Sequence, residues 1–192
     1  MNTYDHFPVI ETDRLRLRPV IESDVKEIYA AFSDTDALRF YGMEPLKTEV
    51  EAYELIQAFE KGFTTGSSIR WGIILKEQDK LIGTCGFHNW SKSDRRTELG
   101  YELIRAYWHN GFMNEALRAI LHYGFNGMEF NRIAAVIRPE NNSSRTLVTK
   151  LGFHEEALLR EHQRVGDDYY DMYIYSLLKK NADLYGQEAN SI

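Results

Sequence analysis

The stretch that decides the fold is LGYELIRAYWHNGFMNEA, residues 99–116. Its first five residues are typical of a strand, and its second half opens the segment with the strongest helical spacing of apolar residues in the chain. A helix N-terminus presents unpaired backbone N–H groups and about half a positive charge, so it can bind a pyrophosphate without basic side chains. Gly111 permits a close approach of such a ligand. Most single glycines before a helix are only turns, so the rest of the chain has to support this interpretation.

Apolar periodicity on both sides of this stretch predicts helices interspersed among strands. Helical spacing is found over 23–33, 48–63, 113–125 and 142–151. Strand-length apolar or alternating runs are found over 15–18, 68–75, 80–90, 97–103, 132–138, 157–164 and 169–178. Polar turns join some strands and helices join others, so the sheet is expected to be mixed. The prediction is a mixed α/β (α+β) fold with about seven strands and about four helices.

The composition is that of a single folded domain. The chain has 192 residues, of which 43% are hydrophobic and 27% charged, and its net charge is -6. We expect one domain over 1–180 and a polar, frayed tail over 181–192. The negative charge argues against a broad nucleic-acid surface. Neither a secretion signal nor an apolar run long enough for a bilayer is apparent, which predicts a cytoplasmic protein with no membrane contact.

Several separated motifs in order give a more specific indication. They are residues 11–18, 99–103, 108–113, 138–144, 150–153 and 171–178. Together they resemble the GNAT superfamily of acyl-CoA-dependent N-acetyltransferases, and within it the branch that contains ribosomal-protein alanine N-acetyltransferases. The resemblance covers nearly the whole chain. It implies a GNAT-like sheet that splays between the fourth and fifth main strands, with acetyl-CoA in the gap.

The resemblance also implies which residues hold the cofactor. The loop that opens the helix over 113–125 would bind the pyrophosphate, while Leu103 and Asn141 would contact the pantetheine arm. The loop residues are Trp108, His109, Asn110, Gly111, Phe112, Met113 and Asn114. Met113 departs from the family pattern, which has a small residue there. A long side chain at this position could crowd the phosphate, so cofactor affinity is where we expect a difference.

Acetyl transfer to an amine needs a base, a polarised carbonyl and a proton donor. Glu98 and Glu102 belong to one predicted strand and point to one face if that strand is regular, so either could accept the amine proton, directly or through water, with Glu98 slightly preferred. A backbone N–H near Leu103, unpaired where strands splay, could stabilise the developing oxyanion.

The resemblance supplies candidates for the proton donor and for substrate handling. The branch that modifies ribosomal proteins uses a serine matched here by Ser144, and a glutamate matched by Glu156 is implicated in handling the substrate. Many other GNAT enzymes use a tyrosine as the acid, for which Tyr173 and Tyr175 on the final strand are available.

The acceptor stays open at this stage. The resemblance to that branch implies that the acceptor is a protein N-terminal amine. The alternative acceptors on the same fold are a polyamine, an aminoglycoside-like drug or a small metabolite. A non-catalytic module that binds acyl-CoA is a further alternative. The histidines have no metal-ligand spacing, so no metal is expected. Edge strands in this fold often pair between subunits, which allows a homodimer.

Overall fold

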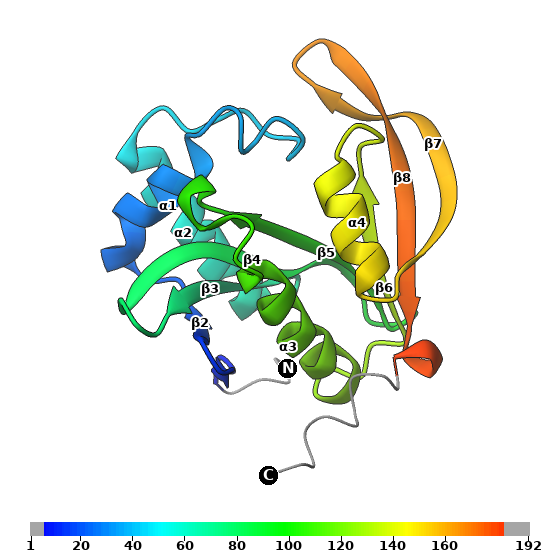
Figure 1. Ribbon diagram of the computed structural model, residues 1–192, viewed down its shortest axis with the longest axis horizontal. Helices are drawn as coiled ribbons and strands as arrows, with labels where there is room; N and C mark the ends of the chain where they lie inside the picture. The colour runs from blue at the N-terminus through cyan, green and yellow to red at the C-terminus, as the bar shows by residue number, and fades with distance from the viewer. Residues whose placement is uncertain (1–5, 183–192) are drawn as a thin grey trace.

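The computed structural model describes residues 6–182 as one eight-stranded sheet with helices on both faces (Figure 1). The strands follow the order β1-β2-β3-β4-β5-β6-β8-β7. They are β1 Ile10–Glu11, β2 Leu15–Pro19, β3 Ile69–Leu75, β4 Lys80–Ser91, β5 Arg96–Leu103, β6 Arg132–Ile137, β7 His154–Val165 and β8 Asp168–Leu178. The helices are α1 Val25–Phe32, α2 Glu49–Thr65, α3 Phe112–Asn126 and α4 Asn142–Lys150. The predicted fold class is therefore confirmed.

Differences from the sequence-based expectation lie at the ends of elements. β1 was not expected, because a two-residue strand has no periodicity to detect. β7 begins at His154, three residues before the expected start at position 157, so the last hairpin is longer than predicted. The first residues of the expected frayed tail are ordered, since Lys179–Asn181 form a short 3-10 helix and Ala182 is buried. The rest of that tail, 183–192, lies outside the described residues.

The helices begin and end where local chemistry favours it. Thr48 caps α2, because its Oγ1 accepts a hydrogen bond from the backbone N–H of Glu51 at 3.3 Å. Gly66 ends the same helix in the left-handed conformation that glycine adopts without strain. Among the described residues, no helix has both the length and the apolar character needed to cross a membrane.

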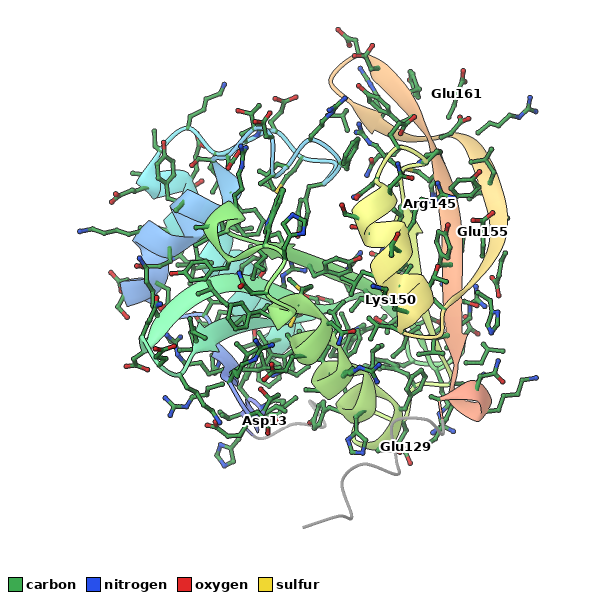
Figure 2. The ribbon with its side chains drawn as sticks, in the orientation of Figure 1. Asp13, Glu129, Arg145, Lys150, Glu155 and Glu161 are labelled. Atoms are coloured by element: carbon green, nitrogen blue, oxygen red, sulfur yellow. The ribbon has the colours of Figure 1, made fainter. Side chains whose placement is uncertain are left out.

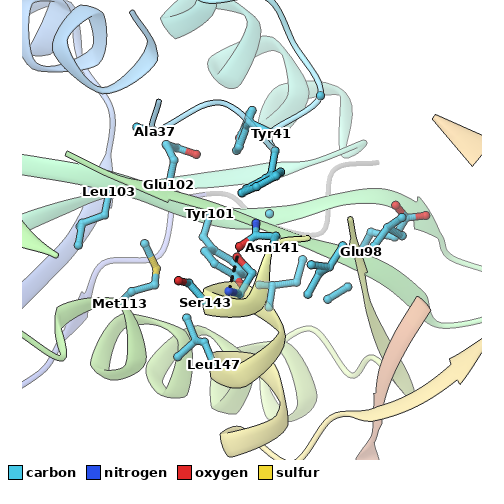
Figure 3. Close-up of a pocket in the computed structure, with 18 of the residues that line it drawn as sticks. Ala37, Tyr41, Glu98, Tyr101, Glu102, Leu103, Met113, Asn141, Ser143 and Leu147 are labelled. Atoms are coloured by element: carbon cyan, nitrogen blue, oxygen red, sulfur yellow. Dashed lines mark hydrogen bonds between the residues drawn. The ribbon is translucent and has the colours of Figure 1, made fainter. Parts of the chain in front are cut away.

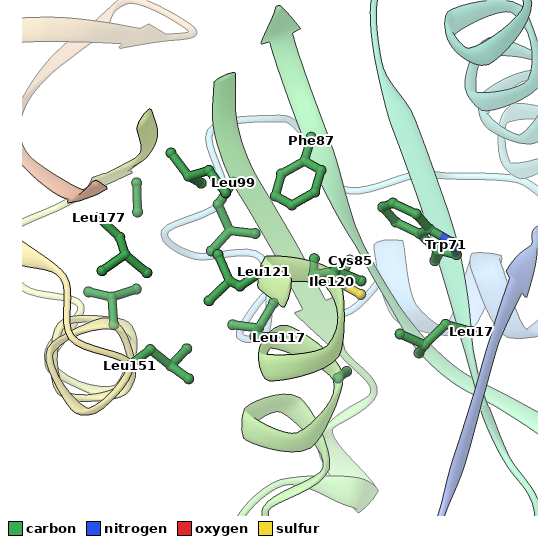
Figure 4. Packing of buried hydrophobic residues seen from close by; sticks show 14 of the residues in the cluster. Leu17, Trp71, Cys85, Phe87, Leu99, Leu117, Ile120, Leu121, Leu151 and Leu177 are labelled. Carbon is green, nitrogen blue, oxygen red and sulfur yellow. The ribbon is translucent and has the colours of Figure 1, made fainter. Parts of the chain in front are cut away.

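The core has two parts, one on each face of the sheet. The larger part packs α3 and α4 against the sheet, and Leu117, Ile120 and Leu121 of α3 contribute to it (Figure 4). The smaller part packs α1 and α2 against the other face around Phe32 and Ile56. A strand in the middle of the sheet therefore has a helix layer on each side, and its alternating side chains face different layers.

The sheet opens between β5 and β6. These two strands are parallel, and they pair only through Arg96, Thr97 and Glu98 of β5. Beyond Glu98, β5 continues to pair with β4 on its other side as far as Leu103. One edge of residues 99–103 is thus left without a strand partner. This is the expected splay between the fourth and fifth main strands.

Candidate active site

A cleft with a volume of about 1810 Å³ occupies the opening between β5 and β6. β5, the first turns of α3 and α4, the loop after α1 and the β7–β8 hairpin contribute to its walls. In Figure 3, Leu103 and Glu98 lie toward opposite ends of β5, with Tyr101 and Asn141 between them in this view. The cleft therefore runs from the start of α3 to the point where the two strands meet.

The loop before α3 has an unusual backbone. His109 has φ +62° and Gly111 has φ +79°, both in the left-handed region. A Cβ built on Gly111 would find only Arg14 within 4 Å, at 3.5 Å, so backbone conformation rather than space requires glycine here. Arg14 also fixes the loop, because its guanidinium binds Glu115 at 2.7 Å and the carbonyl of Asn110 at 3.0 Å. The loop and the N-terminus of α3 are thus held in place before any ligand arrives.

Most of the residues predicted to hold the cofactor are brought together. Those that line the cleft are Leu103, Trp108, His109, Gly111, Phe112, Met113, Asn114 and Asn141. Asn110 is not among the lining residues, and its side-chain amide donates to the carbonyl of Trp108 at 2.9 Å. The indole N–H of Trp108 donates to the Leu103 carbonyl at 2.8 Å, which ties the loop to the end of β5. The side-chain Oδ1 of Asn141 caps α4 by accepting a hydrogen bond from the backbone N–H of Ser144 at 3.1 Å.

Glu98 and His88 form a pair at the closed end of the cleft. They are directly opposite each other in the β4–β5 ladder, and their Nε2 and Oε2 atoms are 3.6 Å apart. The hydrogen bond from His88 lowers the pKa of Glu98 and outweighs the effect of its partial burial. Both side chains line the cleft. His88 was not predicted as a site residue, because the sequence alone does not place it opposite Glu98; the register of the β4–β5 hairpin does.

Glu102, the other candidate base, is committed to a buried ion pair. Its two oxygens accept hydrogen bonds from Arg70 and from the Thr84 hydroxyl, and all three side chains are buried. Arg70 also donates to the Tyr41 hydroxyl at 2.6 Å. Burial raises the pKa of Glu102, and the Arg70 guanidinium opposes that shift. Glu98 and Glu102 do point to one face, as expected, but Glu98 is the one with a carboxylate open to the cleft.

Ser144 lines the cleft at the start of α4, close to Tyr101. The Tyr101 hydroxyl is buried and has no hydrogen-bond partner of good geometry within residues 6–182. Burial raises its pKa to about 12, and the Ser144 hydroxyl opposes the shift. The hydroxyl of Tyr101 therefore stays protonated at neutral pH, next to the predicted proton donor.

Three residues predicted to act in catalysis or substrate handling do not line the cleft, namely Glu156, Tyr173 and Tyr175. Glu156 binds Arg132 at 2.8 Å and accepts from Ser176 at 2.6 Å, and the Arg132 contact lowers its pKa to about 2. Glu156 is engaged in this ion pair and is not among the residues that line the cleft, so its part in substrate handling stays a prediction. The Tyr175 hydroxyl donates a hydrogen bond to Glu155 at 2.6 Å, and the Tyr173 ring stacks on the Arg145 guanidinium. Figure 2 shows Arg145 and Glu155 beside α4.

Replacement of Tyr101 by Phe tests whether its hydroxyl is truly unpartnered. We expect Tyr101→Phe to leave the free energy of unfolding unchanged or to raise it by about 1 kcal/mol, because a buried hydroxyl without a partner is destabilising. Tyr175→Phe is the matched control and should lose about 1 kcal/mol, since that hydroxyl bonds Glu155 and Arg145. Urea denaturation of both variants measures the difference. A larger loss for Tyr101→Phe than for the control would contradict the expectation.

No group of three or more His, Cys, Asp or Glu side chains within residues 6–182 is arranged to hold a metal ion. The site offers instead an N-terminal helix end, a strand edge and a carboxylate–imidazole pair around one cleft. Such a set can bind an anionic ligand, polarise a carbonyl group and move a proton.

Comparison with known proteins agrees with this geometry. The family model described as "Acetyltransferase (GNAT) domain" matches residues 14–154. The uncharacterized N-acetyltransferase YoaA of Bacillus subtilis is 39% identical over 173 residues, covering 90% of this chain and 98% of the relative. The [ribosomal protein uS5]-alanine N-acetyltransferase of Escherichia coli is 25% identical over 177 residues, covering 88% of this chain and 89% of the relative.

Solved structures give the same result for the fold. A GNAT-family acetyltransferase from Bacillus anthracis has a TM-score of 0.80 at 26% identity, over 90% of this chain and 99% of that one. The spermidine N-acetyltransferase of Vibrio cholerae, solved with CoA and spermine, has a TM-score of 0.78 at 20% identity, over 89% of this chain and 99% of that one. At that identity the second likeness concerns the fold alone.

Proposed function

Because the chain belongs to the GNAT family of acetyltransferases, we propose that it transfers the acetyl group of acetyl-CoA to a primary amine, the acceptor being a protein N-terminus. The observation that carries the proposal is the cleft at the β5–β6 splay, with the α3 N-terminus at one end and the Glu98–His88 pair at the other. Acetyl-CoA would supply the acetyl group as a thioester.

The residues of the cleft divide into those that hold acetyl-CoA and those that move protons. The backbone N–H groups at the start of α3 would bind the pyrophosphate, and the open edge of β5 together with the Asn141 amide would hold the pantetheine. A backbone N–H near Leu103 would stabilise charge on the carbonyl oxygen. The amine attacks the thioester carbon and the carbon–sulfur bond breaks. Glu98 takes part in removing the amine proton, and Ser144 gives its hydroxyl proton to the departing sulfur and regains a proton from water.

The charges in the cleft favour a peptide N-terminus over a polyamine. The carboxylates that line it are Asp36, Glu98 and Glu102. Asp36 is paired with Arg105 at 2.9 Å and Glu102 with Arg70, so of the three only Glu98, beside the His88 imidazole, has no permanently charged partner. A polyamine carries several positive charges, which need unpaired carboxylates to replace their hydration. The similarity to the uS5-alanine acetyltransferase points the same way, and such an acceptor would be met in the cytoplasm.

The test is acetyl transfer to a set of defined amines. Peptides that begin with a free alanine or serine, the same peptides with a blocked N-terminus, and spermidine are each mixed with the protein and acetyl-CoA. Free thiol is followed by absorbance, and the products are identified by mass spectrometry. We expect thiol release and a single added acetyl group only on the free peptides.

Two other outcomes would decide against this acceptor or this activity. Turnover with spermidine but not with peptides would favour the small-amine alternative. Binding of acetyl-CoA without turnover on any amine would favour the non-catalytic module.

A further inference from the structure

The imidazole of His88 is an ionisable group that lines the cleft and to which no role has yet been given. Its side chain is 44% exposed and lines the cleft from β4, opposite Glu98. We propose that His88 accepts the proton of the acceptor amine and that Glu98 orients the imidazole. This inference rests on the proposed function and assigns the base within that same site.

The ring position follows from the strand register. Glu98 is the last β5 residue that pairs with β6, so the His88–Glu98 pair lies where the cleft closes. A Cβ built on Gly100 would be 3.2 Å from Cε1 and 3.4 Å from Nδ1 of His88, so this edge of the ring lies over Gly100. Nε2 is the nitrogen next to Glu98. Nδ1 is thus turned along β5 toward its unpaired stretch, where the thioester is expected.

The absence of a side chain at Gly100 leaves room for this arrangement. The same built Cβ would be 2.9 Å from Nη1 of Arg70, so the imidazole and the guanidinium approach each other over this one residue. Gly100, Glu98 and Glu102 share one face of β5, whereas Tyr101 and Leu103 point to the face covered by α3 and α4. The base would therefore act on the face opposite the helices that hold acetyl-CoA.

The proton balance favours an imidazole over a carboxylate. The acceptor amine enters neutral, its nitrogen lone pair forms the bond to the acetyl carbon, and its N–H proton passes to Nδ1 of His88. Glu98 accepts a hydrogen bond from Nε2–H and stabilises the imidazolium until the proton leaves to water. An α-amino group has an ordinary pKa of about 8 and imidazole one of about 6.5, while the pKa of Glu98 is held below its ordinary value of about 4.3. A base whose pKa is closer to that of the amine accepts the amine proton more readily.

The charged and titratable groups around His88 come from β3, β5 and β7. Glu98 on β5 favours the imidazolium, and Arg70 on β3 opposes it, although the charge of Arg70 is largely balanced by Glu102. Arg96 acts on Glu98 from the start of β5. His162 and Arg164 line the same cleft from β7. These charged groups are the surroundings in which His88 would accept the proton.

The test compares pH profiles of acetyl transfer for the full chain and its variants. For His88→Gln we expect kcat to fall about 10²- to 10⁴-fold, with loss of the acidic limb of the profile and no change beyond about twofold in the KM for acetyl-CoA. Glu98→Gln should keep the limb, moved to lower pH, because the carboxylate that stabilises the imidazolium is gone. His162→Gln is the matched control, a histidine in the same cleft, and should keep the limb in its original position.

Chemical rescue separates a base from a structural role. In His88→Ala, added imidazole should restore turnover, and methylated imidazoles of different pKa should do so in proportion to their basicity. An active wild-type protein whose profile is unchanged by His88→Gln would overturn this inference while leaving the proposed function intact. No transfer by the wild-type protein to any amine would instead overturn the proposed function itself.

Discussion

In a calorimetric titration, Gly111→Glu is expected to weaken acetyl-CoA binding more than 100-fold, to the point where no heat of binding is measured. Gly111 has φ +79°, a conformation that costs other L-residues about 1–2 kcal/mol. The Cβ itself meets no protein atom closer than 3.5 Å, so the new carboxylate can extend into the space at the start of α3. There it would compete with the pyrophosphate for the backbone N–H groups and repel its negative charge.

A second glycine gives the control for this experiment. Gly166, in the turn between β7 and β8, has φ +60° and no atom within 4 Å of a built Cβ. Gly166→Glu therefore introduces a similar backbone strain and the same charge far from α3, and it should leave the dissociation constant within about twofold. Undiminished binding by Gly111→Glu would show that the cofactor phosphates do not lie on this helix N-terminus.

The second large effect is expected from the buried ion pair of Glu102. Glu102→Ala leaves the Arg70 guanidinium without its carboxylate at a side chain that is only 9% exposed. We expect the free energy of unfolding, measured in urea, to fall by about 3–5 kcal/mol, because an unpaired buried charge is strongly destabilising. The double variant Arg70→Met, Glu102→Leu should recover most of that loss, since an apolar pair of similar size removes the charge as well.

An exposed ion pair provides the comparison. Arg132 and Glu156 have side chains 28% and 40% exposed, so Glu156→Gln is expected to cost less than about 1 kcal/mol. If Glu102→Ala were no more destabilising than Glu156→Gln, Arg70 would have to be compensated by some group other than Glu102. A separate variant, Glu102→Gln, removes the carboxylate charge but keeps the size of the side chain. Its acetyl-transfer rate, measured on the folded protein, tests whether Glu102 takes part in proton transfer.

The sequence predicted the fold well because its information on the fold is local. The helix over 113–125 and the strand over 97–103 each have their own periodicity and end signals, and their order restricts the topology. The short strand β1 was not predicted, because it forms only by pairing with β2. The loop that we expect to bind the cofactor is indicated by motifs that are contiguous in sequence.

The roles of individual carboxylates were harder to predict because they depend on partners distant in the chain. Glu98 and Glu102 are equivalent by periodicity, and what separates them is Arg70, which lies 32 residues away from Glu102 on another strand. Glu156 looked available until its contact with Arg132, 24 residues away, was seen. His88 faces Glu98 only in the observed β4–β5 register. Such pairings need the tertiary structure.

The short parallel contact between β5 and β6 has a further consequence for how this protein tolerates change. β5 has three different surroundings. One row of its side chains, with Glu98 and Glu102, faces the side on which we propose that the acceptor binds, the other row belongs to the core, and the unpaired edge beyond Glu98 offers main-chain atoms. Main-chain atoms are the same whatever residue is present. Substitutions in the first row can therefore alter the choice of acceptor or the proton transfer while the edge keeps its hydrogen-bonding groups. The specificity for the acceptor can thus change without a change in the binding of the acetyl donor.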